Sequence, residues 1–344
     1  MPRRRRLCWA QCQSRMSSQW SVDSEQYHVP VMLEEALEGL SLRSDGTYVD
    51  VTFGGGGHSR AILERLGEGG RLLAFDQDSD AVECVNALMR ECVSATQSFT
   101  FINENFRYLK SFLRLHGVRQ VDGILADLGV SSHQFDVAER GFSTRFDGEL
   151  DLRMDRRSET TAADLVNTLG EEDLARLLKL YGELPNARQM AKAIVQYRGV
   201  KGSERTNAGI RTTGELKEAV QKHLPRGMEN KYLAMLFQAL RIEVNGELEA
   251  LKEMLQQASE VLVPGGRLVV ISYHSLEDRL VKNFMRSGNF EGEVKKDFYG
   301  NVLSPMRMVS HGAVKASEEE LERNNRARSA RLRVGEMREL RVKN

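Results

Sequence analysis

The stretch Tyr48-Val-Asp-Val-Thr-Phe-Gly-Gly-Gly-Gly-His-Ser59 joins a short apolar run to four consecutive glycines. The apolar run at 48–53 is typical of a buried strand, and a helix can begin at His58. The glycines at 54–57 permit backbone conformations that other residues avoid, and they let a ligand lie against bare peptide. Free N–H groups at the start of the helix can bind an electron-rich group. The stretch therefore predicts a strand, a ligand-binding turn and a helix.

A second apolar strand is expected at 71–75, and Asp76 follows it directly. In doubly wound sheets, an acid at this position accepts hydrogen bonds from the ribose of an adenosine-containing ligand; the alternative is that Asp76 caps the next helix. The dinucleotide fingerprint Gly-x-Gly-x-x-Gly fits neither register, because its last glycine would fall on Ser59 or Arg60. Adenosine-ribose chemistry without a pyrophosphate cradle favours S-adenosylmethionine over NAD.

Length and composition indicate a globular protein of one large or two ordinary domains. The chain has 344 residues, 41% of them hydrophobic and 28% charged, with a formal net charge of zero. Any contact with nucleic acid must therefore come from local basic patches. No apolar run approaches the roughly 20 residues that a membrane-spanning helix needs. The four cysteines show neither a CxxC pair nor a zinc spacing, which predicts a reduced intracellular protein without a metal site.

The N-terminus differs from the rest of the chain. Its first 20 residues are rich in arginine, contain no acid and hold both tryptophans. They could be a disordered basic arm, an organellar transit peptide, or the product of a start assigned upstream of Met16. We expect residues 1–25 to be a basic, disordered extension outside the fold.

Strands and helices are expected to alternate through the first part of the chain. The expected strands are at 48–53, 71–75, 99–103, 121–129 and 266–272, and the expected helices between them include 33–40, 59–66 and 79–91. This alternation predicts an α/β fold, a doubly wound and mostly parallel sheet with helices on both faces. Ligands bind such sheets at the carboxyl ends of the strands. The glycine turn, Asp76, Phe106 and Asp127 should therefore lie together.

Roughly 140 residues separate the fourth expected strand from the fifth, far more than the dozen or so that a crossover needs. Their pattern is helical at 171–181, 186–197 and 213–223, and a long helix at 233–262 returns to the sheet. We therefore expect an inserted all-helical subdomain at 135–231, for substrate recognition. It would interrupt a discontinuous domain formed by 26–134 and 232–344.

Asp127 ends the fourth expected strand, where it can orient an exocyclic amine by accepting a hydrogen bond from its N–H. Such an amine is a poor nucleophile, because its lone pair is delocalised into the ring, so alignment with the methyl donor is most of the catalysis. Asp127 could instead hold the amino group of the donor, or brace a loop. His58 is a candidate ligand contact or a helix cap. His274, at the end of the fifth strand, is a candidate base or a structural residue.

Arginines and aromatic residues interleave just beyond Asp127. The candidates for phosphate contacts and base stacking are Arg140, Phe142, Arg145 and Arg153. Because acids share the stretch, a solvated, salt-bridged loop is the alternative. The arginine-rich end at 323–343 has fewer compensating acids, and we expect it to contact RNA as well.

Several long motifs occur in the order found in one family. They are His28-Val-Pro-Val31, Thr52-Phe-Gly-Gly-Gly-Gly-His-Ser59, Asp122-Gly-Ile-Leu-Ala-Asp-Leu-Gly-Val-Ser-Ser132, Arg140-Gly-Phe-Ser143, Asp151-Leu-Arg-Met154, Phe237-Gln-Ala-Leu-Arg-Ile-Glu-Val-Asn245 and Ser275-Leu-Glu-Asp-Arg279. From about residue 28 to residue 333 the chain resembles the bacterial RsmH (MraW) methyltransferases. The resemblance departs from the family pattern at 181–188, just before Phe237, and at 324–329, which affects the details of RNA docking.

The resemblance implies a Rossmann-like class I methyltransferase that uses S-adenosylmethionine, releases S-adenosylhomocysteine, and methylates N4 of a cytidine in the decoding region of small-subunit (16S) rRNA. Phe106 would pack on the adenine and Asp76 would hold the ribose. The donor contacts carried over by motif position are Gly56, Gly57, His58, Asp76, Phe106, Asp127 and Gln134. The implied partner is small-subunit rRNA or the 30S particle, in the bacterial cytoplasm and away from membranes. An organellar location and a homodimer stay open.

Two other functions compete with RNA methylation. A nicotinamide dehydrogenase is disfavoured by the failed glycine fingerprint and by the lack of a hydride-transfer constellation. An RNA-binding ribosome-assembly factor, built on a methyltransferase fold with little or no turnover, is the stronger alternative. The intact glycine turn, Asp76 and Asp127 argue against it without excluding it.

Overall fold

The computed structural model describes residues 30–91, 98–203, 209–300, 302–310 and 312–339. The predicted extension at 1–25 lies outside the described residues. Among the described helices, none is both long and apolar enough to cross a membrane.

In the described part of the chain, seven strands form one sheet in the order β3-β2-β1-β4-β5-β7-β6. Strands β1 to β5 run parallel, β7 runs antiparallel to β5, and β6 runs antiparallel to β7. Their bounds are β1 Thr47–Asp50, β2 Arg71–Phe75, β3 Ser98–Ile102, β4 Val121–Asp127, β5 Leu262–Ser272, β6 Met306–Met308 and β7 Arg331–Met337. The expected α/β class with a mostly parallel sheet is confirmed.

Helices cover both faces of the sheet, because its central strands carry apolar side chains on both sides. Neighbouring residues alternate between the faces: Val49 and Ile124 enter one apolar core, while Tyr48 and Leu125 enter the other. The first core includes side chains of α5 Leu109–Leu115, α12 Glu247–Val261 and α13 Ser275–Ser287. The second is covered by α2 Leu33–Leu40, α3 Gly57–Arg65, α4 Ala81–Glu91 and α14 Glu318–Arg323.

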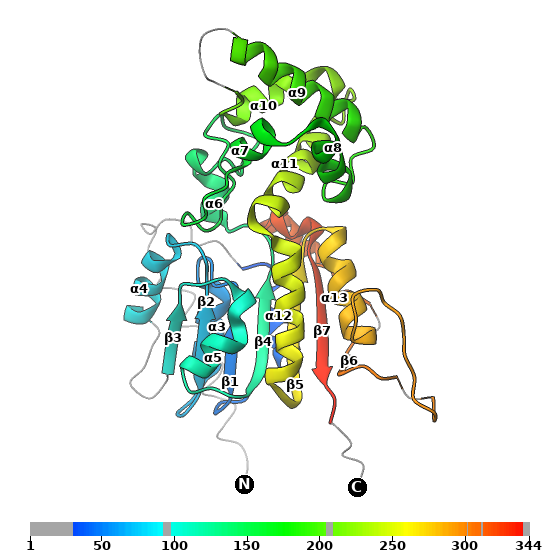
Figure 1. The fold of residues 1–344 in the computed structure, drawn as a ribbon. Coiled ribbons are helices and arrows are strands. Elements are labelled where there is room, and N and C mark those ends of the chain that lie inside the picture. The colour runs from blue at the N-terminus through cyan, green and yellow to red at the C-terminus, as the bar shows by residue number, and fades with distance from the viewer. Residues whose placement is uncertain (1–29, 92–97, 204–208, 301, 311, 340–344) are drawn as a thin grey trace, which may run out of the picture.

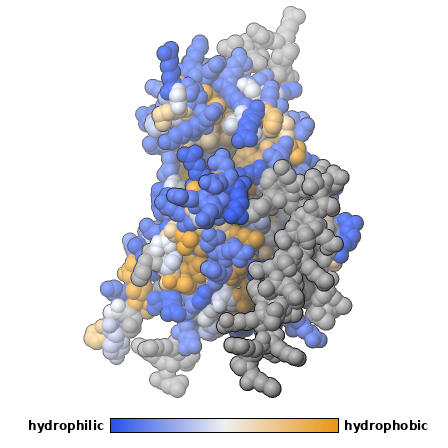
Figure 2. Space-filling model, turned by 180° about the vertical axis from the view of Figure 1, so that it is seen from behind, coloured by the Kyte–Doolittle hydropathy of each residue, from blue (hydrophilic) through white to orange (hydrophobic). Residues whose placement is uncertain are grey.

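A helical part with its own apolar core stands beyond the carboxyl ends of the parallel strands (Figure 1). Its helices are α7 Ala162–Thr168, α8 Glu171–Leu180, α9 Ala187–Ser203, α10 Thr213–Val220 and α11 Glu229–Asn245. Its surface seen from behind is mostly hydrophilic (Figure 2). Leu233, Leu236 and Leu240 of α11 belong to this core, so the helix that we assigned to the sheet domain from residue 232 contributes to the helical core.

The long helix expected at 233–262 is wrong in one respect, because it is two helices. Gly246 adopts a left-handed conformation (φ 57°) and ends α11, with its N–H donating to the carbonyls of Ile242 and Glu243. The second helix, α12, ends at Val261, and the Pro264-Gly265-Gly266 segment that follows lies inside β5. The register between β4 and β5 shifts there, between the pairs Val121–Leu262 and Gly123–Arg267, and so accommodates the extra residues. The apolar stripe continued across Gly246, which concealed the break.

The arginine-rich end contains β7, which the sequence pattern did not reveal. Leu332 and Val334 are buried, and so is Arg333, at 6% exposure. Arg333 binds Asp278 of α13 through Nε and Nη2 at 2.7 and 3.1 Å. Its expected contact with RNA is therefore wrong, because an acid distant in sequence takes up its guanidinium.

Two glycine-to-alanine changes should have opposite effects on stability. Gly246→Ala places a side chain at a positive φ and should lower the free energy of unfolding by about 1 kcal/mol. Gly199→Ala lies within α9, where an added Cβ meets nothing within 4 Å, and should raise it by up to about 1 kcal/mol. Urea denaturation of both variants tests this, and equal shifts would contradict the assigned break between α11 and α12.

Candidate active site

The glycine turn links β1 to α3 and leaves its backbone open at one point. Gly54 and Gly56 have φ values of 52° and 78°, which other residues rarely adopt. A Cβ on Gly56 would lie 2.7 Å from the Phe53 ring, and one on Gly57 would lie 2.3 Å from Pro30. A Cβ on Gly55 would meet nothing within 4 Å. The turn is therefore tightly packed at Gly56 and Gly57 and open at Gly55, where a ligand can lie against the backbone.

Asp76, at the end of β2, holds this turn in place. Its Oδ2 accepts the N–H of Gly54 at 2.7 Å, and its Oδ1 accepts the N–H of Asp78 at 2.8 Å. Burial raises the pKa of Asp76 to about 6. Each carboxylate oxygen has a second lone pair that these bonds leave for a ligand. Asp76 and the glycine turn therefore lie together, as expected, and a hydrogen bond joins them directly.

Asp127, at the end of β4, lies beside the start of α3. Its N–H donates to Thr52 Oγ1 at 2.6 Å, and its Oδ1 accepts the Tyr273 hydroxyl at 2.7 Å. Its Oδ2 lies 3.9 Å from His58 Nδ1, and its side chain keeps 22% of its surface exposed. Burial raises the pKa of Asp127 to about 6. One oxygen is therefore fixed by the protein, while the other faces a ring nitrogen beyond hydrogen-bond distance.

The charge of this site is negative, and the described residues do not balance it. Asp50, only 1% exposed, accepts Ser59 Oγ at 2.7 Å, and burial raises its pKa. Burial lowers the pKa of His58, whose Nε2 lies 3.1 Å from the Val31 carbonyl. With Nε2–H donating to that carbonyl, Nδ1 bears no hydrogen in the neutral ring. Between described residues, no lysine or arginine forms an ion pair with any of the three aspartates.

Phe106 and Gln134 flank this group. Phe106 begins the short 3₁₀ helix η1 Phe106–Tyr108 after β3 and packs, partly exposed, against the first apolar core. Gln134, in α6 Ser132–Asp136, is 4% exposed. Its Nε2 donates to Asp78 at 2.7 Å, and its Oε1 accepts the N–H of Ser131 at 3.1 Å. The protein itself therefore uses both ends of the Gln134 amide, and contact of Gln134 with the donor stays a prediction.

The predicted RNA contacts of Arg140 and Phe142 are wrong, because both side chains are interior, at 1% and 5% exposure. Arg140 forms ion pairs with Asp78 at 2.8 Å and Asp80 at 2.5 Å. The acids that compensate it lie some sixty positions away in the sequence, where the local pattern could not show them.

Arg145 and Arg153 differ from this buried pair. Arg145 is exposed, as an RNA contact requires. The Arg153 side chain is 23% exposed and binds Asp151 at 2.7 Å. Contact of either residue with RNA stays a prediction.

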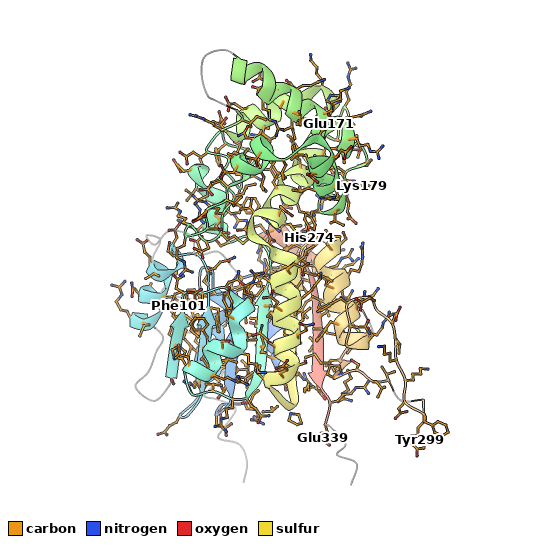
Figure 3. All side chains as sticks on the ribbon, viewed as in Figure 1. Phe101, Glu171, Lys179, His274, Tyr299 and Glu339 are labelled. Atoms are coloured by element: carbon orange, nitrogen blue, oxygen red, sulfur yellow. The ribbon has the colours of Figure 1, made fainter. Side chains whose placement is uncertain are left out.

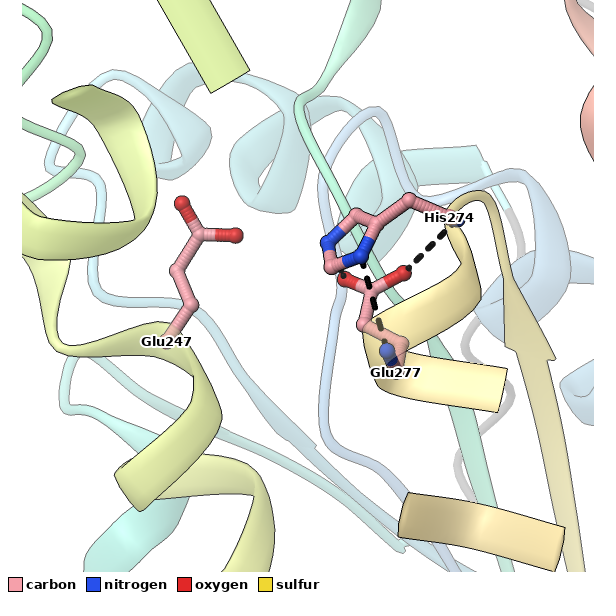
Figure 4. Close-up of side chains that lie close together, drawn as sticks. All are labelled: Glu247, His274 and Glu277. Carbon is pink, nitrogen blue, oxygen red and sulfur yellow. Dashed lines mark hydrogen bonds and ion pairs between the residues drawn. The ribbon is translucent and has the colours of Figure 1, made fainter. Parts of the chain in front are cut away.

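His274 lies at the junction between α12 and the upper helices (Figure 3). It caps α13: its Nδ1 accepts the N–H of Glu277 at 3.4 Å, and its Nε2 lies 3.1 Å from Glu277 Oε1 (Figure 4). Burial pushes the pKa of Glu277 upward, but His274 and Arg241 bring it below its usual value. This geometry favours the structural reading of His274.

Glu247 approaches the same pair from the start of α12, so that these three side chains could in principle hold a cation (Figure 4). Arg241 already binds both Glu247 oxygens, at 2.8 and 2.9 Å. A metal ion would have to displace this guanidinium, and we assign none to the cluster.

Tyr273 is the site residue that the sequence analysis missed. It follows β5 directly, immediately before His274, and its hydroxyl is the hydrogen-bond partner of Asp127. Burial, and then the neighbouring Asp127, raise its pKa well above the usual value, so the hydroxyl stays protonated as a donor. Its place at a strand end on the ligand-binding edge was the available signal.

Two named relatives are similar to this chain along nearly its whole length. Ribosomal RNA small subunit methyltransferase H of Bacteroides thetaiotaomicron is 57% identical over 314 residues, covering 91% of this chain and 98% of the relative. The protein of the same name from Cytophaga hutchinsonii is 55% identical, covering 90% and 99%.

Solved structures of low identity also align along most of the chain. An rRNA methylase from Streptococcus thermophilus aligns with a TM-score of 0.40 at 10% identity, covering 93% of this chain and 100% of that one. SMU.1697c of Streptococcus mutans, in complex with SAH, gives 0.40 at 11%, covering 90% and 99%. Because these TM-scores are low, the description of the fold rests on the strand order given above and not on these alignments. The model of the MraW methylase family matches residues 25–338, and the chain belongs to that family.

Proposed function

We propose that the protein transfers a methyl group from S-adenosylmethionine to the exocyclic N4 amine of a cytidine in the decoding region of small-subunit (16S) rRNA. Membership of the MraW methylase family and the names of its relatives support the reaction class and the RNA. The observation that carries the proposal is the partly open carboxylate of Asp127, held by Tyr273 beside the glycine turn.

The unbalanced negative charge of the site fits this donor. S-adenosylmethionine carries a sulfonium and an ammonium group, whereas NAD carries an anionic pyrophosphate. Buried carboxylates without basic partners favour a cationic ligand and oppose an anionic one. Asp76 would accept the ribose hydroxyls, Phe106 would pack against the adenine, and the bare backbone at Gly55, between Gly54 and the donor contacts Gly56, Gly57 and His58, would lie against the ligand. When bound, the donor supplies the electrophilic methyl group.

Asp127 would orient the target amine. With Oδ1 held by the Tyr273 hydroxyl, Oδ2 can accept one N–H of the cytosine amine and set its direction. A pKa of about 6 leaves Asp127 ionised at neutral pH and able to take the proton that the amine loses after attack. The helical part beyond the strand ends, including residues 135–231, would hold the RNA.

Tritium transfer from labelled S-adenosylmethionine to small-subunit particles, followed by nucleoside analysis, tests the proposal. Label in N4-methylcytidine of 16S rRNA is the expected result. Label in another nucleoside would contradict the N4 assignment. Measurable donor binding without any transfer would favour the ribosome-assembly factor.

Asp127→Asn should lower methyl transfer by about 100-fold or more, because it removes the charge that orients the amine. Protonation of Asp127 mimics this loss, so wild-type kcat/KM should fall as the pH drops through about 6 and level off above it.

Stability measurements provide the control for this variant. The pKa of Asp127 is higher in the folded chain than in the unfolded one, so its ionisation costs stability as the pH rises from about 4 to 6. Asp127→Asn should therefore be at least as stable as wild type at pH 8. A variant that is stable and turns over near normally would contradict the role of Asp127.

Asp76→Ala should weaken donor binding by roughly 1–3 kcal/mol, or about 5- to 150-fold, through loss of a buried acceptor. Calorimetric titration with S-adenosylhomocysteine measures this change. Ser79→Ala, an exposed position in the same loop, is the matched control. Asp76→Asn, which keeps one acceptor oxygen, shows whether the turn survives. Unchanged affinity in a folded Asp76→Ala variant would refute the ribose assignment.

A further inference from the structure

A hollow of about 210 Å³ lies where β5 passes into α13. One wall is formed by this junction, and the other by the segment between η4 Asn325–Ser329 and β7. Among the described residues, those that line it are Tyr273, His274, Ser275, Lys315, Arg328, Ser329, Ala330 and Arg331. The donor and amine contacts proposed above do not use this hollow.

Among the described residues, the lining of the hollow carries positive charge and contains no carboxylate. Lys315 and Arg328 are exposed, and neither forms an ion pair with a described residue. Arg331 lies 3.2 Å from Asp278, but Asp278 also binds Arg333, and the Arg331 side chain remains 51% exposed. The surplus cations thus lie at a space that Ser275 and Ser329 also line.

Two acids beside the lining already have partners. Glu277 is 3% exposed and engaged with His274. Glu183, from the helical part, accepts the Ser275 hydroxyl at 2.5 Å and lies 3.5 Å from Arg279. The rim at Ser275 is therefore where the helical part touches the sheet domain, so the hollow opens beside the junction of the two.

Tyr273 connects this hollow to the active site. Tyr273 lines the hollow, and its hydroxyl lies 2.7 Å from Asp127 Oδ1. A group bound in the hollow is thus one side chain away from the carboxylate that orients the amine. The length of one such side chain is comparable to the distance between a nucleobase and the phosphate backbone of its own strand.

We propose that the hollow binds the phosphodiester backbone of the RNA strand next to the target nucleotide, with Lys315 and Arg328 as the phosphate ligands. The inference rests on the proposed function and adds to it the place where the strand is gripped. Lysine and arginine side chains are common donors to phosphate oxygens of nucleic acids, and these two have no acidic partner among the described residues. Arg140, one of the arginines predicted to contact RNA, is buried and cannot serve.

The salt dependence of RNA binding tests the proposal. Full-length wild type, Lys315→Ala, Arg328→Ala and the double variant are titrated with 16S rRNA over a range of salt concentrations. Each lost phosphate contact should flatten the plot of log affinity against log salt by about 0.7–0.9, and the double variant by about twice that. Arg328→Lys should retain the wild-type slope, and calorimetry should show unchanged binding of S-adenosylhomocysteine in every variant.

Arg307→Ala is the matched control, since it removes one exposed arginine whose partner Glu336 keeps Arg267. It should leave the slope unchanged. Slopes for Lys315→Ala and Arg328→Ala equal to that of wild type would overturn the phosphate site, even if wild type methylates RNA. Flattened slopes in a protein that transfers no methyl group would leave the site standing and refute the proposed function. A wild type that does not bind RNA would contradict both.

Discussion

Largely buried carboxylates without basic partners among the described residues are the constraint on which this structure depends. Asp50, Asp76 and Asp127 end three neighbouring strands, and burial raises the pKa of each. Ionised carboxyl groups at this depth are costly, and backbone N–H groups and hydroxyls relieve only part of that cost. The same bonds fix the glycine turn to β2 and β4 to β5. The same three carboxylates thus carry the unpaired charge and shape the ligand site. A cationic ligand would lower the electrostatic cost of that charge.

Three little-exposed arginines, in contrast, have acidic partners. Arg140 is held by Asp78 and Asp80, Arg241 by Glu247, and Arg333 by Asp278. Each pair joins segments that meet only in the fold. Arg140 brings the start of the helical part against the loop after β2, and Arg333 fastens β7 to α13. Breaking such a pair leaves an uncompensated buried charge, so these arginines stabilise the fold. Their guanidinium groups are then not available to bind RNA. Cations that remain unpaired therefore indicate RNA contacts better than the number of basic residues does.

The sequence could be interpreted wherever its signal was local. Continuous apolar runs located β2 at its observed bounds and β4 within two residues, and the spacing of the strands required an insertion. Signals failed where a partner was distant. The periodic stripe through 233–262 concealed the break at Gly246, and alternating arginines in β7 looked like a solvent-facing basic tail until Asp278 was seen beside Arg333. Tyr273 escaped notice because nothing in its local sequence shows that its hydroxyl reaches Asp127.

By itself the sequence determined the fold class, the glycine turn and the acids at the strand ends, since strand periodicity, the conformational freedom of glycine and strand-end position are properties of short segments. Only the tertiary structure decided which charges are spent inside the protein and which remain available. Arg140 and Arg328 are both arginines in basic stretches, yet one is buried between two aspartates and the other faces an open hollow. The physical reason is that burial and ion pairing depend on contacts between residues far apart in the chain.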